Sequence, residues 1–233
     1  MRTYYLLFFV SFCLSLHTNA QKRKTFKIRP GEKLVEIIPQ EEKYSYAKFI
    51  DGHVYFRKNT YSAAKLNYNS LYGEMQFIDD KGDTLSLADE SGIKLIVINS
   101  DTFYFDKGYL KQLENLGEIK LARKTFFTFT NRQKLGAFGE TTSASVDTYN
   151  AISGSNYFKE LVAKEILTIA KYSVFFIGDR FNNFKELNKK NLLEFYSKNG
   201  SELQAYLKDS NPDFANEEDI KKMLRHFNSA FQH

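Results

Sequence analysis

The chain has 233 residues, a formal net charge of +5 and a sequence pI near 9.0. The positive excess is small and spread along the chain, so it does not predict a nucleic-acid partner. No run after the N-terminal segment approaches the roughly 20 apolar residues that a membrane-spanning helix needs, so we expect no membrane span in the mature protein.

The first 20 residues show the order of features found in a secretory signal peptide. Arg2 supplies a positive charge, residues 4–16 form a mostly apolar run, and Ala20 is a small residue suited to cleavage. We therefore expect export to the periplasm or the cell exterior, with cleavage near Ala20. The mature chain of about 213 residues is expected to be soluble.

Cys13 is the only cysteine and lies inside this apolar run. Lipidation of an exported cysteine requires a small residue before it, and Phe12 stands there instead. The mature chain therefore contains no cysteine, which excludes a disulfide, a thiol nucleophile and a thiolate metal site. Its stability has to come from its core.

Between residues 21 and 135, short apolar and aromatic runs alternate with turn residues. The runs are KYSYAKFI, HVYFRK, SAAKLNYN, EMQFI, TLSLA, IKLIVI, TFYFD and GEIKLARKTFFTFT. Asp51-Gly52 separates the first two runs, and Asp-Gly accepts the positive φ angles of a tight hairpin turn. This spacing predicts an antiparallel β meander, folded as an open sheet, a sandwich or a partial barrel. Residues 93–98 are apolar on both faces, so we expect them near its centre.

An acidic stretch at residues 73–90, GEMQFIDDKGDTLSLADE, raises the question of a metal loop. Asp79, Asp80 and Asp83 flank Lys81-Gly82 at the tip of an expected hairpin. A calcium loop needs oxygen ligands at alternate positions, and Lys81 occupies one of them. We interpret the stretch as a turn and keep these three aspartates as a weak calcium-site candidate. A catalytic pair of carboxylates stays open, although no spacing selects one.

Residues 136–156 are rich in Ser, Thr and Gly and predict a long exposed loop. Ser143 and Ser145 lie in this loop, but they lack the frame of a serine nucleophile. The mature chain has three histidines, His53, His226 and His233, and none has the close helical pairing of a zinc site. We predict no catalytic residue, no metal and no cofactor.

Residues 157–233 combine strands and helices. KEILTIAKYSVFFI predicts one long strand or two short ones, with a return strand at residues 184–187. KKNLLEFYSKNG predicts a helix that is capped by Asn188 and closed by Gly200, and Ser201 is expected to cap the next helix. Residues 216–219 predict a capping box, and an apolar stripe follows at helical spacing, formed by Ile220, Met223, Leu224 and Phe227. We expect this α+β arrangement to pack as one domain with the meander.

Three segments carry a resemblance to other proteins. They are VYFRKNTYSAAKLNYNSLYGEMQFIDDKGDTLSLADE, KLGAFGETTS and KKNLLEFYSKNG. Together they resemble a group of small exported bacterial proteins of unknown function. The resemblance covers most of the mature chain and implies a location in the cell envelope. It implies no activity and no catalytic residue.

Three functions are compatible with these patterns. The first is a non-enzymatic envelope protein that binds another protein or a surface polymer, in keeping with the many tyrosines. The second is a carrier of a small apolar ligand such as a lipid, held between a curved sheet and helices. The third is a carboxylate-dependent hydrolase. We favour the first, because no catalytic motif is assembled in the sequence.

Overall fold

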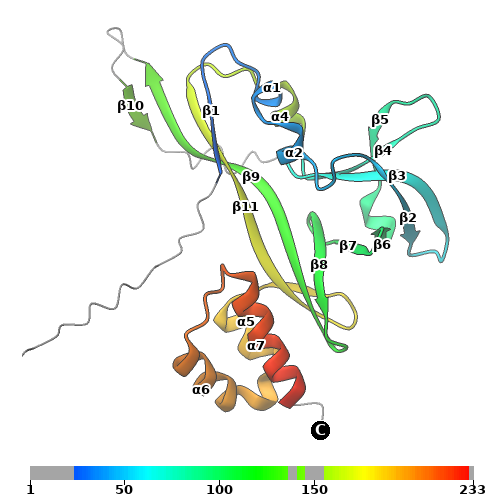
Figure 1. Cartoon of the computed structure of the whole chain (residues 1–233), viewed down its shortest axis with the longest axis vertical. Coiled ribbons are helices and arrows are strands. Elements are labelled where there is room, and N and C mark those ends of the chain that lie inside the picture. Colours follow the sequence, from blue (N-terminus) through cyan, green and yellow to red (C-terminus); the bar gives the residue numbers. More distant parts are fainter. Residues whose placement is uncertain (1–23, 136–140, 145–154, 231–233) are drawn as a thin grey trace, which may run out of the picture.

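The structure, a computed structural model, describes residues 24–135, 141–144 and 155–230. The expected signal peptide, Ser145 and His233 lie outside these ranges. The described strands form one open sheet in which every pairing is antiparallel (Figure 1), in the order β1-β11-β9-β8-β7-β6-β2-β3-β4-β5. β12 pairs with β11, and β10 pairs with β9.

The strands match most of the runs that the sequence predicts. Their bounds are β1 Thr25–Ile28, β2 Ile50–Phe56, β3 Tyr61–Asn69, β4 Glu74–Ile78, β5 Thr84–Ser86, β6 Ile93–Ile98, β7 Asp101–Phe105, β8 Tyr109–Asn115, β9 Ile119–Leu135, β10 Thr141–Ala144, β11 Ile166–Asp179 and β12 Phe184–Glu186. β10 lies within the segment expected to be a loop. The KEILTIAKYSVFFI run forms one long strand, and its return strand is β12.

The hairpin predicted at Asp51-Gly52 is wrong. Both residues lie inside β2, and the chain turns instead after Phe56, where Asn59 has a φ angle of 60°. Gly52 is buried between β3 and β6, and a Cβ atom there would lie 2.7 Å from the Val97 carbonyl oxygen. This glycine therefore permits a close approach between strands, a role that the turn pattern does not reveal.

Six helices of the described chain gather at two ends of the molecule. They are α1 Leu34–Ile37, α2 Gln40–Lys43, α4 Ser155–Glu160, α5 Lys189–Phe195, α6 Gly200–Ser210 and α7 Glu217–Ala230. Figure 1 shows α1, α2 and α4 near one end of the long β9–β11 ribbon and α5, α6 and α7 near the other. The smaller strands β2–β7 project to one side.

Two apolar cores sit on the ribbon, one under each group of helices. The upper core packs α1 and α4 against the ribbon through residues that include Leu34, Phe158 and Phe127. The lower core packs α5–α7 against it through residues that include Leu121 and Ile177. A third core fills the concave meander of β2–β8, and β6 lies near the middle of the strand order, as predicted.

The C-terminal helices confirm part of the predicted capping. The Asn188 side chain accepts a hydrogen bond from the Asn191 amide at 2.9 Å, and Asn216 caps α7 in the same way at the Glu218 amide. Gly200 does not close a helix, because its φ of −60° is helical and it begins α6. Ser201 accordingly lies inside α6 and is not its cap.

The apolar stripe of α7 is fully inside the lower core, as core packing predicts. Ile220, Met223 and Leu224 have no exposed surface, and Phe227 is 2% exposed. Within the ranges that the structure describes, no helix combines the length and the apolar character needed to cross a membrane.

Candidate functional site

A polar break separates the two cores on one face of the β9–β11 ribbon. Paired residues of antiparallel strands lie on the same face, and alternate residues along each strand share that face. Thr125 pairs with Ser173, between the Phe127–Lys171 pair and the Arg123–Phe175 pair. Phe127 belongs to the upper core and Phe175 to the lower core. The middle of this face therefore carries hydroxyl and basic groups where apolar packing stops.

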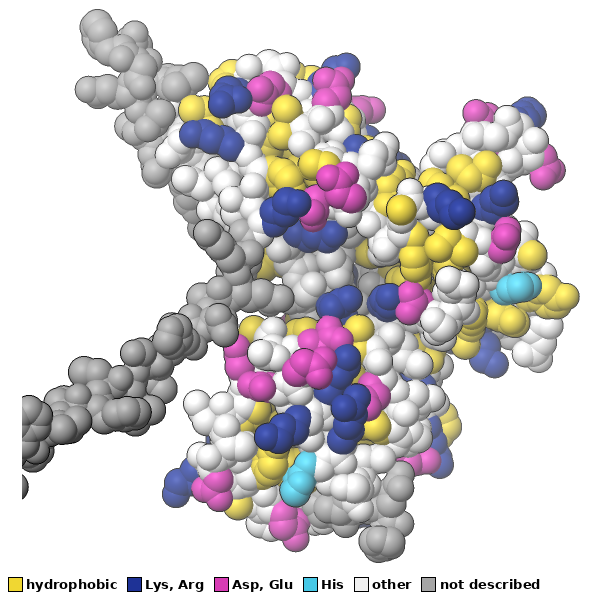
Figure 2. All heavy atoms as spheres, in the orientation of Figure 1, with side chains coloured by type: hydrophobic (Ala, Val, Ile, Leu, Met, Phe, Trp, Pro, Cys, Tyr) yellow, Lys and Arg dark blue, Asp and Glu magenta, His cyan; other side chains and the backbone are white. Residues whose placement is uncertain are grey.

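A cavity of about 360 Å³ opens at this break, and we call it the waist pocket. Three cations from three strands line it: Lys111 from β8, Arg123 from β9 and Lys171 from β11. Ser45, Ser70, Thr125 and Ser173 add hydroxyl groups to the lining. At the waist between the upper and lower parts of the molecule, Figure 2 shows Lys and Arg side chains beside Asp and Glu side chains.

Arg123 is held by the first turn of α7. Its Nη1 donates to Glu217 Oε2 at 2.7 Å, and the Lys221 ammonium lies 2.6 Å from the other oxygen of that carboxylate. The Nε atom of Arg123 is buried and has no hydrogen-bond partner. A buried N–H group without an acceptor lowers the stability of the folded state, so a ligand oxygen that accepts from Arg123 Nε would be favourable.

Lys171 lies near Arg123 on the same face. Its Nζ donates to the Glu42 carbonyl oxygen at 2.7 Å and lies 3.8 Å from the Glu42 carboxylate. Burial lowers the pKa of Lys171, the Glu42 carboxylate raises it, and the positive charge of Arg123 lowers it again. The protein therefore holds two like charges close together, with incomplete neutralisation of each.

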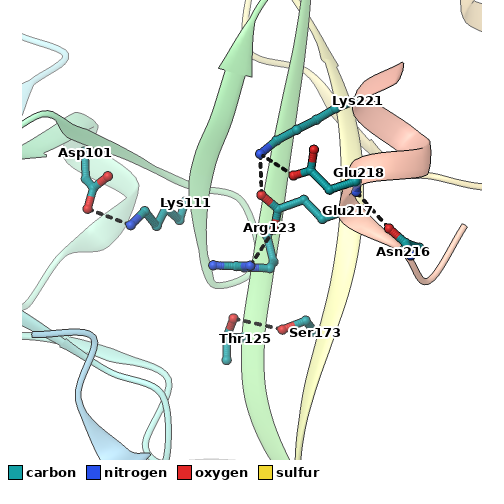
Figure 3. A network of polar contacts seen from close by, with 9 residues as sticks. All are labelled: Asp101, Lys111, Arg123, Thr125, Ser173, Asn216, Glu217, Glu218 and Lys221. Carbon is teal, nitrogen blue, oxygen red and sulfur yellow. Dashed lines mark hydrogen bonds and ion pairs between the residues drawn. The ribbon is translucent and has the colours of Figure 1, made fainter. Parts of the chain in front are cut away.

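The third cation, Lys111, pairs with Asp101 of β7 in the meander. Lys111 Nζ lies 2.6 Å from Asp101 Oδ2, which also accepts the Tyr46 hydroxyl at 2.5 Å. Figure 3 shows the Arg123 guanidinium between this pair and the first turn of α7, with the Thr125–Ser173 hydroxyl contact beside it. That contact measures 3.3 Å, and the Tyr68 hydroxyl donates to the Thr125 carbonyl at 2.9 Å.

The chemistry of the waist pocket suits an anion. Arginine, lysine and hydroxyl groups are the donors that bind carboxylate and phosphate oxygens. Glu41 is the one carboxylate among the residues that line the cavity. The carboxylates that pair with the three cations are not part of the lining; they are Asp101, Glu42 and Glu217. An anionic ligand inside the cavity can therefore compete with these carboxylates for the cations.

The structure gives the weak calcium-site candidate the geometry of a turn. Asp79 Oδ1 accepts hydrogen bonds from the Lys81 amide at 2.9 Å and the Asp83 amide at 2.8 Å, and Gly82 has a φ of 88°. Asp79 and Asp80 also line an open cavity of about 820 Å³ beside β2 and β3. Across the described ranges, no three or more His, Cys, Asp or Glu side chains come together as metal ligands.

The serines and histidines that the sequence analysis weighed lie on separate elements wherever the structure describes them. His53 of β2 contacts the Tyr61 ring at a centroid distance of 5.8 Å, whereas His226 of α7 stacks on Tyr206 at 4.9 Å. Ser143 lies on β10, and Ser145 and His233 fall outside the described residues. Both described histidines therefore have aromatic neighbours as their ring contacts.

No sequence motif predicts the waist pocket, but β11 carries one signal of it. In IAKYSVFFI the alternate residues Ile169, Lys171, Ser173, Phe175 and Ile177 run apolar, polar, polar, apolar, apolar. A polar pair inside an otherwise buried face marks the position of the site. The partner strand places Thr125 opposite that interruption.

Comparison of the chain with protein-family models, with curated proteins and with solved structures gave no match. The resemblance to small exported bacterial proteins therefore stays a prediction. The arrangement of the waist pocket is what supports a function for this chain.

Proposed function

We propose that this is an exported, non-enzymatic envelope protein that uses the waist pocket to bind anionic groups of a surface polymer or a partner protein. One observation carries the proposal: Lys111, Arg123 and Lys171 come from three strands and line one cavity together with hydroxyl groups. Export is proposed from the features of residues 1–20.

The electrostatics favour an anionic ligand over a neutral one. Burial and the neighbouring positive charge of Arg123 lower the pKa of Lys171, so an anion in the pocket relieves repulsion and stabilises the protonated amine. The buried Nε of Arg123 gains an acceptor when an oxygen anion enters. Charge-assisted hydrogen bonds of this kind are about twice as strong as neutral ones.

Binding is supported over hydrolysis by the composition of the pocket. A hydrolase of the carboxylate type needs two acidic groups facing one substrate. The waist pocket has a single lining carboxylate, Glu41, among three cations. Its hydroxyl groups have no described histidine beside them, since His53 and His226 pack against tyrosines elsewhere.

Titration calorimetry of residues 21–233 with polygalacturonate, an acidic polysaccharide, tests the proposal. We expect binding that weakens with salt, and no binding of uncharged dextran. Arg123→Gln should weaken the affinity about tenfold or more, because it removes charge-assisted bonds to the anion. Arg225→Gln is the matched control, since Arg225 also joins α7 to the sheet, at Glu114, outside the pocket.

Equal losses in the two variants would show that general positive charge, and not the waist pocket, attracts the polymer. Binding of dextran as strong as that of polygalacturonate would contradict the anionic specificity. Thermal unfolding of each variant verifies that Arg123→Gln has not simply unfolded the lower core.

A further inference from the structure

A second cavity, of about 370 Å³, lies at the ribbon and has a different chemistry. Its apolar floor includes Phe126, Val174 and Phe176, which alternate along the strands with Thr125 and Ser173 and therefore point to the opposite face of the ribbon. All three side chains of this floor are half-buried. The lining also includes Phe127 from the waist-pocket face, and Tyr68 and Ser70 line both cavities. Tyr72 and the buried Phe158 add further aromatic surface to the lining.

Lys124 of β9 lines this cavity and lies on the same face of the ribbon as Phe126 and Val174. Its Nζ donates to the Lys107 carbonyl oxygen at 2.6 Å, in the turn between β7 and β8. The amine packs over Gly108, whose φ is 122°, and a Cβ atom at that glycine would lie 2.8 Å from Nζ. The missing side chain of Gly108 thus leaves the space that the amine occupies.

The position of Lys124 leaves its charge poorly compensated. An ammonium has three donors, and the Lys107 carbonyl uses one of them. Burial lowers the pKa of Lys124, and the Asp106 carboxylate offsets this only in part. An anion that enters the cavity would gain a charge-assisted bond and restore the preference for the protonated amine.

We propose that this cavity binds an anionic amphiphile with one hydrocarbon chain, such as a fatty acid. The carboxylate meets the Lys124 ammonium, and the chain lies on Phe126, Val174 and Phe176. Burial of the chain against aromatic and aliphatic surface supplies the hydrophobic part of the affinity. The cavity is at the small end of the range for ligand sites, which favours a single chain over a lipid with several chains.

The charges of the lining agree with this ligand. Lys107, Lys124 and Glu186 are its charged residues, so the lining is net positive. Glu186 is exposed on β12 and is oriented by a strand that pairs with the lower end of β11. The inference goes beyond the proposed function, because it uses another cation, a different apolar floor and another class of ligand.

Calorimetric titration of residues 21–233 with three probes tests the inference. Decanoate carries both the charge and the chain, decanol carries the chain alone, and acetate carries the charge alone. We expect decanoate to bind at least about tenfold more tightly than decanol and acetate, because only decanoate uses both parts of the cavity. Decanoate is used below its micellar concentration.

Lys124→Met identifies the residue that binds the carboxylate. We expect it to weaken decanoate about tenfold or more and to leave decanol within about twofold, while Lys124→Arg retains decanoate binding. Lys111→Met, in the waist pocket, is the matched control and should leave decanoate unchanged. Nuclear magnetic resonance of the Lys124 ε-methylene should show that decanoate raises the pKa of this amine.

Three outcomes would overturn the inference. These are equal affinities for decanoate and decanol, a Lys124→Met variant that binds decanoate normally, and a loss that follows Lys111→Met instead. Retained decanol binding shows that the Lys124→Met variant is folded at the cavity. Failure here leaves the polygalacturonate result untouched, because that experiment depends on Arg123.

Discussion

Gly52 shows that a residue type typical of turns can instead lie inside a strand for a packing reason. Asp51-Gly52 has the composition of a hairpin turn, yet Gly52 is buried in β2, where an added Cβ atom would lie 2.7 Å from the Val97 carbonyl oxygen. The true turn contains Asn59, which tolerates its φ of 60°. Local composition predicts turns from residues that are neighbours in the sequence. The strand that approaches Gly52 is β6, which is distant in the sequence, so the residues around Gly52 do not reveal this contact.

Gly52→Ala should destabilise the protein by about 1–3 kcal/mol, because the new methyl group has to displace backbone in a paired strand. Gly200→Ala is the matched control: Gly200 has helical φ and ψ angles and nothing within 4 Å of an added Cβ. That change should raise the free energy of unfolding by about 0.5–1 kcal/mol. Urea denaturation measures both, and a neutral Gly52→Ala would contradict the close-approach interpretation.

At the scale of elements, periodicity predicts β9 and β11 but not what each face contacts. The KEILTIAKYSVFFI run predicted one long strand or two short ones, and the structure has one strand of 14 residues, β11. Lys171 and Ser173 interrupt one face, and a polar residue in a strand ordinarily indicates exposure to solvent. Only the helices packed above and below show that these residues line a pocket between two cores.

Substitution of cap residues can test where α5 and α6 begin, because the predicted and observed boundaries place Ser201 differently. Asn188→Ala should cost about 1 kcal/mol, because the Asn188 side chain accepts a hydrogen bond from the Asn191 amide. Ser201→Ala should change stability by no more than about 0.5 kcal/mol, since Ser201 lies inside α6 and is exposed. Thermal unfolding compares the two, and a larger loss for Ser201→Ala would support the boundary that the sequence predicted.

At the scale of the whole molecule, the sequence predicts an antiparallel sheet with C-terminal helices, and the structure has both. The sequence does not predict that the helices divide the ribbon into two cores with a polar waist between them. The upper core requires α1 and α4, which are separated by more than 100 residues and are short. Their joint packing depends on long-range contacts that short helical patterns do not encode.

The division into separate cores predicts that the lower helices open before the meander unfolds. Leu224 is fully buried in the lower core, and none of the buried residues of that core belongs to the meander core. Leu224→Ala should lower stability by about 2–5 kcal/mol through the cavity it creates. Hydrogen exchange should then show the amides of α5–α7 losing more protection than those of β3 and β6, because local opening leaves the ladder of the meander intact.

Lys222→Ala, exposed on the same helix, is the matched control and should leave the exchange pattern unchanged. An equal loss of protection in α7 and β6 would contradict this prediction, because it would mean that the lower core and the meander core unfold as a single cooperative unit.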